Sequence, residues 1–149
     1  MPFRFTKPTT SAQVAAYIAV VLFLCMAVIQ VGIAICLLPV TIVWGSSQKT
    51  HTVQNSLASL AACVILSAMA WIIYRRSQPA PEPYTNTASW IIAFYMVLNT
   101  LGNFLSPNAV ERFVFGSMTV VLAVCSFVVA SSAKLPATNS ENVRYEIIA

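Results

Sequence analysis

The residues of this chain that could carry chemistry together are His51, Glu111 and Arg112. They belong to two polar segments, residues 45–55 and 106–112, which connect long apolar runs. His51 is the only histidine, and a histidine beside a carboxylate can exchange protons near neutral pH. A lone histidine in a polar loop can equally be no more than solvated. The three residues are therefore candidates for a catalytic site, and no more specific chemistry follows from them.

Glu111 also has a purely structural interpretation. It follows Asn108 by three positions, which is the spacing of a capping box, and Pro107 is expected to end the preceding helix. A carboxylate in the first turn of a helix interacts favourably with the positive end of the helix dipole. A helix cap and a catalytic acid are thus alternative roles for this residue.

Polar side chains recur at helical spacing shortly before this segment. One helix face, at positions i, i+3, i+4 and i+7, is formed by Asn99, Gly102, Asn103 and Ser106. Carboxamides are costly against lipid, so we expect this face to look inward or to lie near the membrane surface. A hydrogen-bonded clamp to Gln30 or Ser67 is one interpretation. A polar lining for a substrate or ion pathway is the other.

Motifs for the common catalytic and cofactor-binding chemistries are missing. The sequence has no phosphate-binding glycine loop, nucleophile elbow, HExxH motif or histidine run. Its four cysteines fall in apolar runs without a Cys-x-x-Cys spacing. We expect no metal site and no cofactor.

The elements that must position these residues are four runs without Asp, Glu, Lys or Arg, at 12–47, 50–74, 85–109 and 113–133. The chain is 58% apolar and 8% charged, with a mean hydropathy of +0.79. Each run can supply the roughly 20 apolar residues that cross a bilayer as a helix. The predicted fold is all-α: a bundle of four transmembrane helices with up-down topology. A single membrane domain at 12–133 would contain helices at about 12–38, 56–74, 88–105 and 109–131. A cytoplasmic arm (1–11) would precede it and a flexible cytoplasmic tail (134–149) would follow, with an extended polar connection at 77–87.

The distribution of positive charge predicts the orientation. Six of the eight Lys and Arg residues fall in the two terminal segments and the middle loop, and the other two are Lys49 and Arg112. The positive-inside rule then places both termini in the cytoplasm. Expected anchors at the membrane interface are Trp44, Trp71, Tyr74, Arg75 and Arg76. We predict a multi-pass membrane location, in the cell membrane if the source is bacterial.

Small residues at helical spacing suggest how the helices approach each other. Ser59, Cys63 and Ser67 recur at every fourth position of the second predicted helix. In the fourth, small and large residues alternate from Gly116 to Ala130. Small residues allow close backbone approach between membrane helices. These stripes indicate packing within one bundle, or a face for self-association.

The passage from Leu98 to Arg112, which reads Leu-Asn-Thr-Leu-Gly-Asn-x-x-Ser-x-x-x-x-Glu-Arg, resembles a group of small four-helix integral membrane proteins, mainly bacterial and functionally uncharacterised. The resemblance extends over about residues 15–131 and includes a Trp-Gly pair before His51. The group has a second glycine after that pair, where this chain has Ser46. The resemblance implies a four-helix membrane fold and assigns no catalytic residue.

These observations favour a non-catalytic membrane protein, either an accessory subunit of a larger membrane complex or a self-associating homo-oligomer. Its partners would be the lipid bilayer and other membrane helices, and no feature indicates nucleic acid. One alternative is a membrane enzyme or enzyme helper for an apolar substrate, with His51, Glu111 and Arg112 at its mouth. Another is a small oligomeric pore lined by Asn99 and Asn103.

Overall fold

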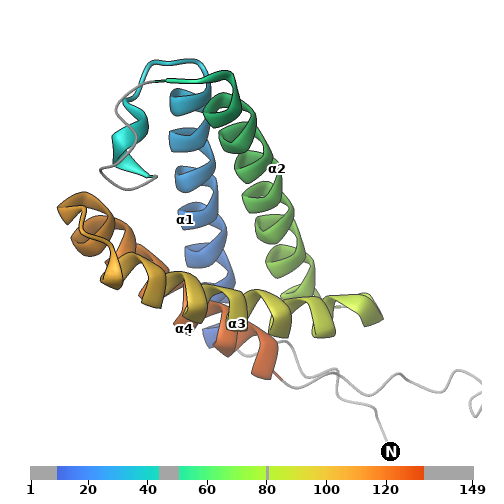
Figure 1. Cartoon of the computed structure of the whole chain (residues 1–149). Helices are drawn as coiled ribbons and strands as arrows, with labels where there is room; N and C mark the ends of the chain where they lie inside the picture. The colour runs from blue at the N-terminus through green and yellow to red at the C-terminus, as the bar shows by residue number, and fades with distance from the viewer. Residues whose placement is uncertain (1–9, 44–50, 80, 133–149) are drawn as a thin grey trace, which may run out of the picture.

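The structure, a computed structural model, describes residues 10–43, 51–79 and 81–132 of the 149-residue chain (Figure 1). Within these ranges every regular element is helical and no strand occurs. Four long helices and two short helical segments follow in order: α1 (Thr10–Ala34), η1 (Val40–Ile42), α2 (Val53–Arg76), α3 (Pro83–Leu105), η2 (Glu111–Phe115) and α4 (Gly116–Ser131). Trp44, residues 1–9 of the expected arm and the expected tail at 134–149 lie outside the described residues.

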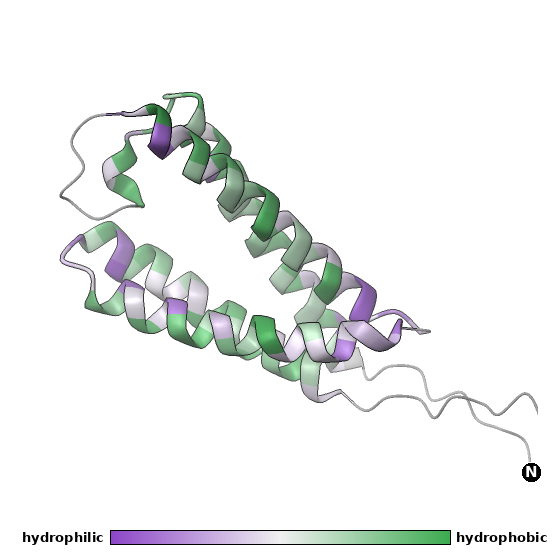
Figure 2. Ribbon diagram, turned by 45° about the vertical axis from the view of Figure 1, so that its right-hand side comes forward, coloured by the Kyte–Doolittle hydropathy of each residue, from purple (hydrophilic) through white to green (hydrophobic). Residues whose placement is uncertain are grey.

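Each long helix is long and apolar enough to cross a membrane. The candidate spans are 24, 24, 23 and 21 residues long, and η2 and α4 together form the last one. Large apolar side chains point outward along all four spans, among them Val28, Val64, Phe94 and Phe113, each about two-thirds exposed. Hydropathy follows the same pattern, with polar residues gathered near the helix ends (Figure 2). Exposing so many large apolar side chains to water is unfavourable, whereas the lipid of a bilayer accommodates them. The structure therefore indicates a multi-pass membrane protein.

The helices pair as two antiparallel hairpins, α1 with α2 and α3 with α4 (Figures 1 and 2). The hairpins are joined mainly by packing of α1 on α4, whereas α2 and α3 diverge from the turn that connects them. The two hairpins therefore form a V when the fold is viewed from the side. Its narrow end holds the start of α1, residues 77–79 and 81–82 between α2 and α3, and the end of α4. At its wide end, η1 lies between the two hairpins.

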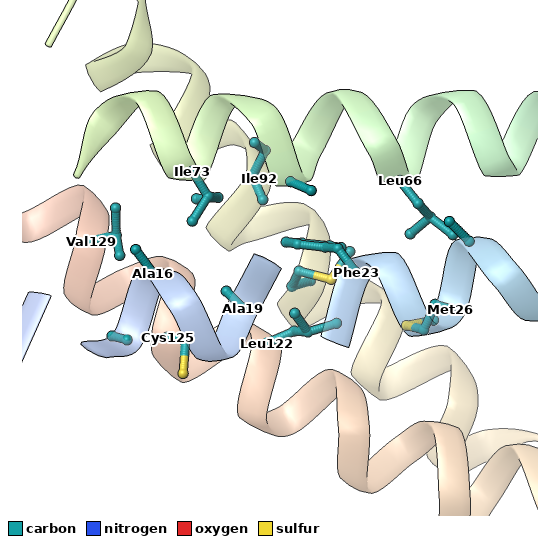
Figure 3. Packing of buried hydrophobic residues seen from close by; sticks show 14 of the residues in the cluster. Ala16, Ala19, Phe23, Met26, Leu66, Ile73, Ile92, Leu122, Cys125 and Val129 are labelled. Atoms are coloured by element: carbon teal, nitrogen blue, oxygen red, sulfur yellow. The ribbon is translucent and has the colours of Figure 1, made fainter. Parts of the chain in front are cut away.

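The core lies where α1 meets the other three helices (Figure 3). Its buried positions on α1 recur at helical spacing and begin with four alanines: Ala12, Ala15, Ala16 and Ala19. Larger side chains follow toward the wide end, where Phe23 is fully buried. Because alanine lets backbones approach closely, the hairpins meet at the narrow end and are spaced apart where Phe23 and Met26 begin.

Several helix boundaries differ from the sequence-based expectation. Helix α3 begins at Pro83, so the predicted extended connection at 77–87 is wrong for its second half. Proline suits the first helical position because its missing N–H would have no partner there and its φ is already helical. Helix α2 begins at Val53, where the Thr52 hydroxyl accepts a hydrogen bond from the Asn55 N–H at 3.2 Å. Helix α1 ends at Ala34 and does not reach residue 38.

The end of α1 is a tight turn with one residue in the left-handed region. Cys36 has φ 60°, and the N–H groups of Leu37 and Leu38 both donate to the Gly32 carbonyl, at 2.8 and 3.0 Å. This doubling back brings the Leu38 side chain to 2.8 Å from where a Cβ on Gly32 would lie, so a larger residue there would require the Leu38 side chain to move. Glycine normally occupies the left-handed position that Cys36 holds here, because a Cβ is disfavoured there.

The narrow end is held by a buried arginine. Arg76 is only 4% exposed, and its Nη2 donates to the Ser132 carbonyl at 2.7 Å and to Asn86 Oδ1 at 3.2 Å. One side chain thus links the ends of α2, α3 and α4. The Arg76 side chain therefore points into the protein, and the role of interface anchor that the sequence suggested for it stays a prediction.

The neighbouring residues face outward. Arg75 pairs with Glu82 and lies 5.7 Å from the centre of the Trp71 ring, which also packs against Tyr74. Hydrogen bonds from Tyr84 and then from Arg75 lower the pKa of the Glu82 carboxyl. Its ionised form therefore favours the folded state above the ordinary pKa, and this contribution is lost as the pH falls through the lowered value. The role of Trp71, Tyr74 and Arg75 as interface anchors stays a prediction.

Replacing Cys36 with glycine tests the left-handed turn. Cys36→Gly removes the Cβ strain. We expect it to leave the free energy of unfolding in detergent unchanged or to raise it by up to about 1 kcal/mol. Cys25→Gly, the matched control on an exposed position within α1, is expected to cost about 1 kcal/mol. Equal losses in both variants would contradict the left-handed assignment.

Removing Arg76 tests the narrow end. Arg76→Ala is expected to lower the free energy of unfolding by about 2–3 kcal/mol, because two hydrogen bonds from a charged donor are lost. Arg75→Ala is the control and should cost about 1 kcal/mol or less, since its ion pair is partly exposed. Unfolding by sodium dodecyl sulfate, followed by circular dichroism, measures both. A smaller loss for Arg76→Ala than for Arg75→Ala would refute the assigned role.

Candidate functional site

The three candidate catalytic residues differ in their burial and in their hydrogen bonds. His51 is exposed in the turn before α2 and makes no hydrogen bond or ion pair with the described residues. Glu111 is buried, at 7% exposure, at the start of η2, whereas Arg112 next to it is exposed. No hydrogen bond or ion pair with a described residue joins His51 to the other two, and the catalytic role of the three residues stays a prediction.

The 106–112 turn is a closed network centred on Ser106. The Ser106 hydroxyl donates to the Glu111 carboxylate and accepts from the Asn108 N–H at 3.1 Å. Arg112 donates to the Ser106 carbonyl through Nε and Nη2, at 3.2 and 2.8 Å. Asn108 Oδ1 caps the Val110 N–H at 2.9 Å. The predicted capping box is thus half correct, because Asn108 caps the helix but the Asn108 N–H binds Ser106 and not Glu111.

Glu111 opens a single turn of π-helix, which sequence patterns did not predict. In η2 the Gly116 N–H donates to the Glu111 carbonyl five positions back. A π-turn adds one residue to the helical turn, so it changes which side chains face inward. Glu111 and Phe115 are buried, while the three residues between them are exposed. Gly116 then allows close packing, since a Cβ there would lie 3.2 Å from the Phe104 ring.

The polar face of α3 contacts α4. Asn103 Nδ2 donates to the Thr119 hydroxyl at 3.3 Å, and Thr119 is fully buried. The expected interhelical clamp therefore exists, but neither expected partner forms it. Ser67 is exposed and donates to the Cys63 carbonyl of its own helix at 2.8 Å, so the small-residue stripe of α2 turns outward at that end. Gln30 of α1 lies across a cavity from α3.

This cavity, about 440 Å³ in volume, lies between the two hairpins at the wide side of the V. Four of its lining residues are the polar groups Gln30, Asn99, Asn103 and Glu111, contributed by α1, α3 and η2. Tyr95 also lines it, and the sequence analysis missed this residue although it lies one turn before Asn99. The remaining wall is apolar: Met26, Ile29, Val43, Ala58, Ala61, Ala62, Ile65, Leu66, Met96 and Phe115.

The cavity suits hydrogen bonding better than proton transfer. Three of its polar residues carry neutral carboxamides, and of the described lining residues only Tyr95 and Glu111 can ionise. The Gln30 Oε1 atom is buried and has no hydrogen-bond partner among the described residues. The described ranges contain no group of three His, Cys, Asp or Glu residues placed to hold a metal ion. In comparisons with known proteins, no family model, curated protein or solved structure matches this chain.

The segment formed by η1 and Val43 borders the cavity at the wide end. Val43, at the end of η1, lines it, and Val40 is almost fully buried. The Asn108 side chain donates to the Thr41 carbonyl and so joins η1 to the 106–112 turn. This contact links segments that lie far apart in the sequence, and no local pattern could have indicated it.

Removing the Ser106 hydroxyl tests the network. Ser106→Ala deprives Glu111 of a donor and the Asn108 N–H of an acceptor, so we expect a loss of about 1–3 kcal/mol in unfolding free energy. Ser117→Ala is the matched control, because that exposed hydroxyl bonds only to the Phe113 carbonyl of its own helix, and it should change stability by less than about 0.5 kcal/mol. Equal stability of the two variants would rule out Ser106 as the centre of the turn.

Proposed function

We propose that this chain is a non-catalytic multi-pass membrane protein that acts by associating with other membrane helices, as an accessory subunit or as a homo-oligomer. Both termini lie in the cytoplasm in this proposal. We also propose kinship with the small four-helix membrane proteins that the 98–112 passage resembles.

The orientation is supported by charge and by the fold together. The start of α1, the end of α2, the start of α3 and the end of α4 share the narrow end of the V. Six of the eight basic residues belong to the segments at or beyond this end. Lys and Arg are enriched in short cytoplasmic loops. The narrow end is accordingly the cytoplasmic one.

The hydrogen bonds of the candidate acid–base residues favour a non-catalytic role. The Glu111 carboxylate accepts a hydrogen bond from the Ser106 hydroxyl, and the Arg112 guanidinium donates to the Ser106 carbonyl. These bonds fix the geometry of a helix–helix connection. A general acid or base must be within reach of a substrate proton, and the exposed His51 is held by none of the described residues.

Gly102 is the observation that carries the proposal for association. It is exposed in α3, and nothing lies within 4 Å of the position that a Cβ would occupy. Glycine in a helix interior costs about 1 kcal/mol relative to alanine, and no contact within the described chain requires it here. It lies among the outward-facing Leu98, Leu101 and Leu105, a combination that allows another helix to approach closely.

Enlarging Gly102 tests this function. In mild detergent we expect the wild-type chain to elute as a complex of fixed stoichiometry, with a larger protein or with copies of itself. Gly102→Leu should abolish most of this association. Its free energy of unfolding should stay within about 1 kcal/mol of the wild-type value, because the space around Gly102 is open. Val124→Leu, an enlargement on the exposed face of α4, is the control and should leave the complex intact.

Light scattering after size-exclusion chromatography gives the mass of each variant. A wild-type chain that is monomeric and free of partners in native membrane extracts would refute the proposal. An unchanged complex with Gly102→Leu would refute the assigned face.

A further inference from the structure

We propose that the cavity between the hairpins binds a membrane lipid whose uncharged headgroup carries a hydroxyl group, of the diacylglycerol class. This inference is independent of the proposed association through Gly102, because the cavity and that face use different residues.

Gln30, which lines the cavity, carries a hydrogen-bond acceptor without a donor among the described residues. The Gln30 Oε1 atom is buried and unpartnered among the described residues, although burying a polar atom without a hydrogen bond costs free energy. This atom has no accessible surface, so a donor in the cavity reaches it when the Gln30 carboxamide turns toward the cavity that the residue lines. A hydroxyl group supplies that donor, and it can also accept from the carboxamide of Asn99, which lines the same cavity.

The wall composition discriminates between headgroups. The Glu111 carboxyl lies in the lining, and the lining residues include no Lys or Arg. A phosphate group would find no cationic partner among these lining residues. A hydroxyl donor is compatible with the Gln30 carbonyl, the asparagine amides and the carboxyl together. The site therefore favours a neutral headgroup over an anionic one.

The apolar part of the wall fits an acyl chain and provides its exit. Ten of the fifteen lining residues are apolar, and a cavity of this size lies within the range of small-molecule sites. Ile65 of α2 and Tyr95 of α3 both line the cavity and are 51% and 47% exposed. The opening thus lies between two diverging helices whose outer surfaces are apolar. A lipid chain can leave the cavity there and continue into the bilayer, while Val43 covers the other side.

Photocrosslinking tests the proposal on the full chain in phosphatidylcholine nanodiscs. The probes are a diacylglycerol and a phosphatidic acid with the same photoreactive acyl chain, which differ only in the headgroup. We expect saturable labelling by the diacylglycerol that unlabelled diacylglycerol competes away, with the adducts on α2 and α3 near Ile65 and Tyr95. Labelling by the phosphatidic acid should be at least about fivefold weaker at equal mole fraction, given the charge discrimination.

Two substitutions connect the labelling to the cavity. Gln30→Leu removes the acceptor and should reduce specific labelling about tenfold, while the unfolding midpoint is unchanged or raised, because an unpartnered polar atom is gone. Gln13→Leu, the same exchange on the half-buried face of α1 outside the cavity, should leave labelling unchanged. Ala62→Phe should block labelling by filling the cavity, and it provides a second test if Gln30→Leu does not fold.

Equal labelling by the two lipids, stronger labelling by the phosphatidic acid, or non-saturable labelling would overturn the proposal. Equal effects of Gln30→Leu and Gln13→Leu would do the same. Measuring the complex mass in the same samples separates this result from the association test, since a monomer that binds the lipid would refute only the proposed function.

Discussion

Four apolar helices must hold together where no water drives them into contact, and this constraint shapes the whole protein. In lipid, helix association depends on close van der Waals packing and on a few interhelical hydrogen bonds. The chain meets the first requirement with the alanines at the start of α1, which lie in the core that joins all four helices. It meets the second with Arg76, whose guanidinium bonds to α3 and to the chain just beyond α4. Both features lie at the narrow end, so the hairpins are joined there and separate beyond it.

The opposite end uses a different kind of interaction. Asn103 bonds to Thr119, Ser106 organises the connection between α3 and α4, and Asn108 binds the backbone of η1. These contacts are hydrogen bonds between small polar groups, and they surround a cavity instead of a packed core. Polar groups inside a membrane domain are costly unless they are paired, and the Gln30 carbonyl at this end has no partner among the described residues.

The number and type of the elements could be predicted from the sequence, because charge-free runs of this length leave few alternatives to membrane helices. The polar face of α3 was also predictable from its spacing, and the structure places Asn99 and Asn103 on one cavity. Their partners were not predictable. Asn103 donates a hydrogen bond to Thr119 and not to Gln30 or Ser67. The partner could not be predicted because the relative rotation of two helices depends on packing between segments distant in the sequence. The π-turn at Glu111 and the inward direction of Arg76 likewise depend on tertiary contacts that no periodicity contains.

The V shape has a mechanical consequence. Helices of 21–24 residues are about 32–36 Å long at a rise of 1.5 Å per residue, somewhat more than a hydrocarbon layer of about 30 Å. Two diverging hairpins cannot both stand upright, so their tilt takes up this excess length. A thinner bilayer demands more tilt, and the hairpins can provide it by rotating about the joined end. Such a rotation would change the distance between Ile65 and Tyr95, and with it the width of the opening between α2 and α3.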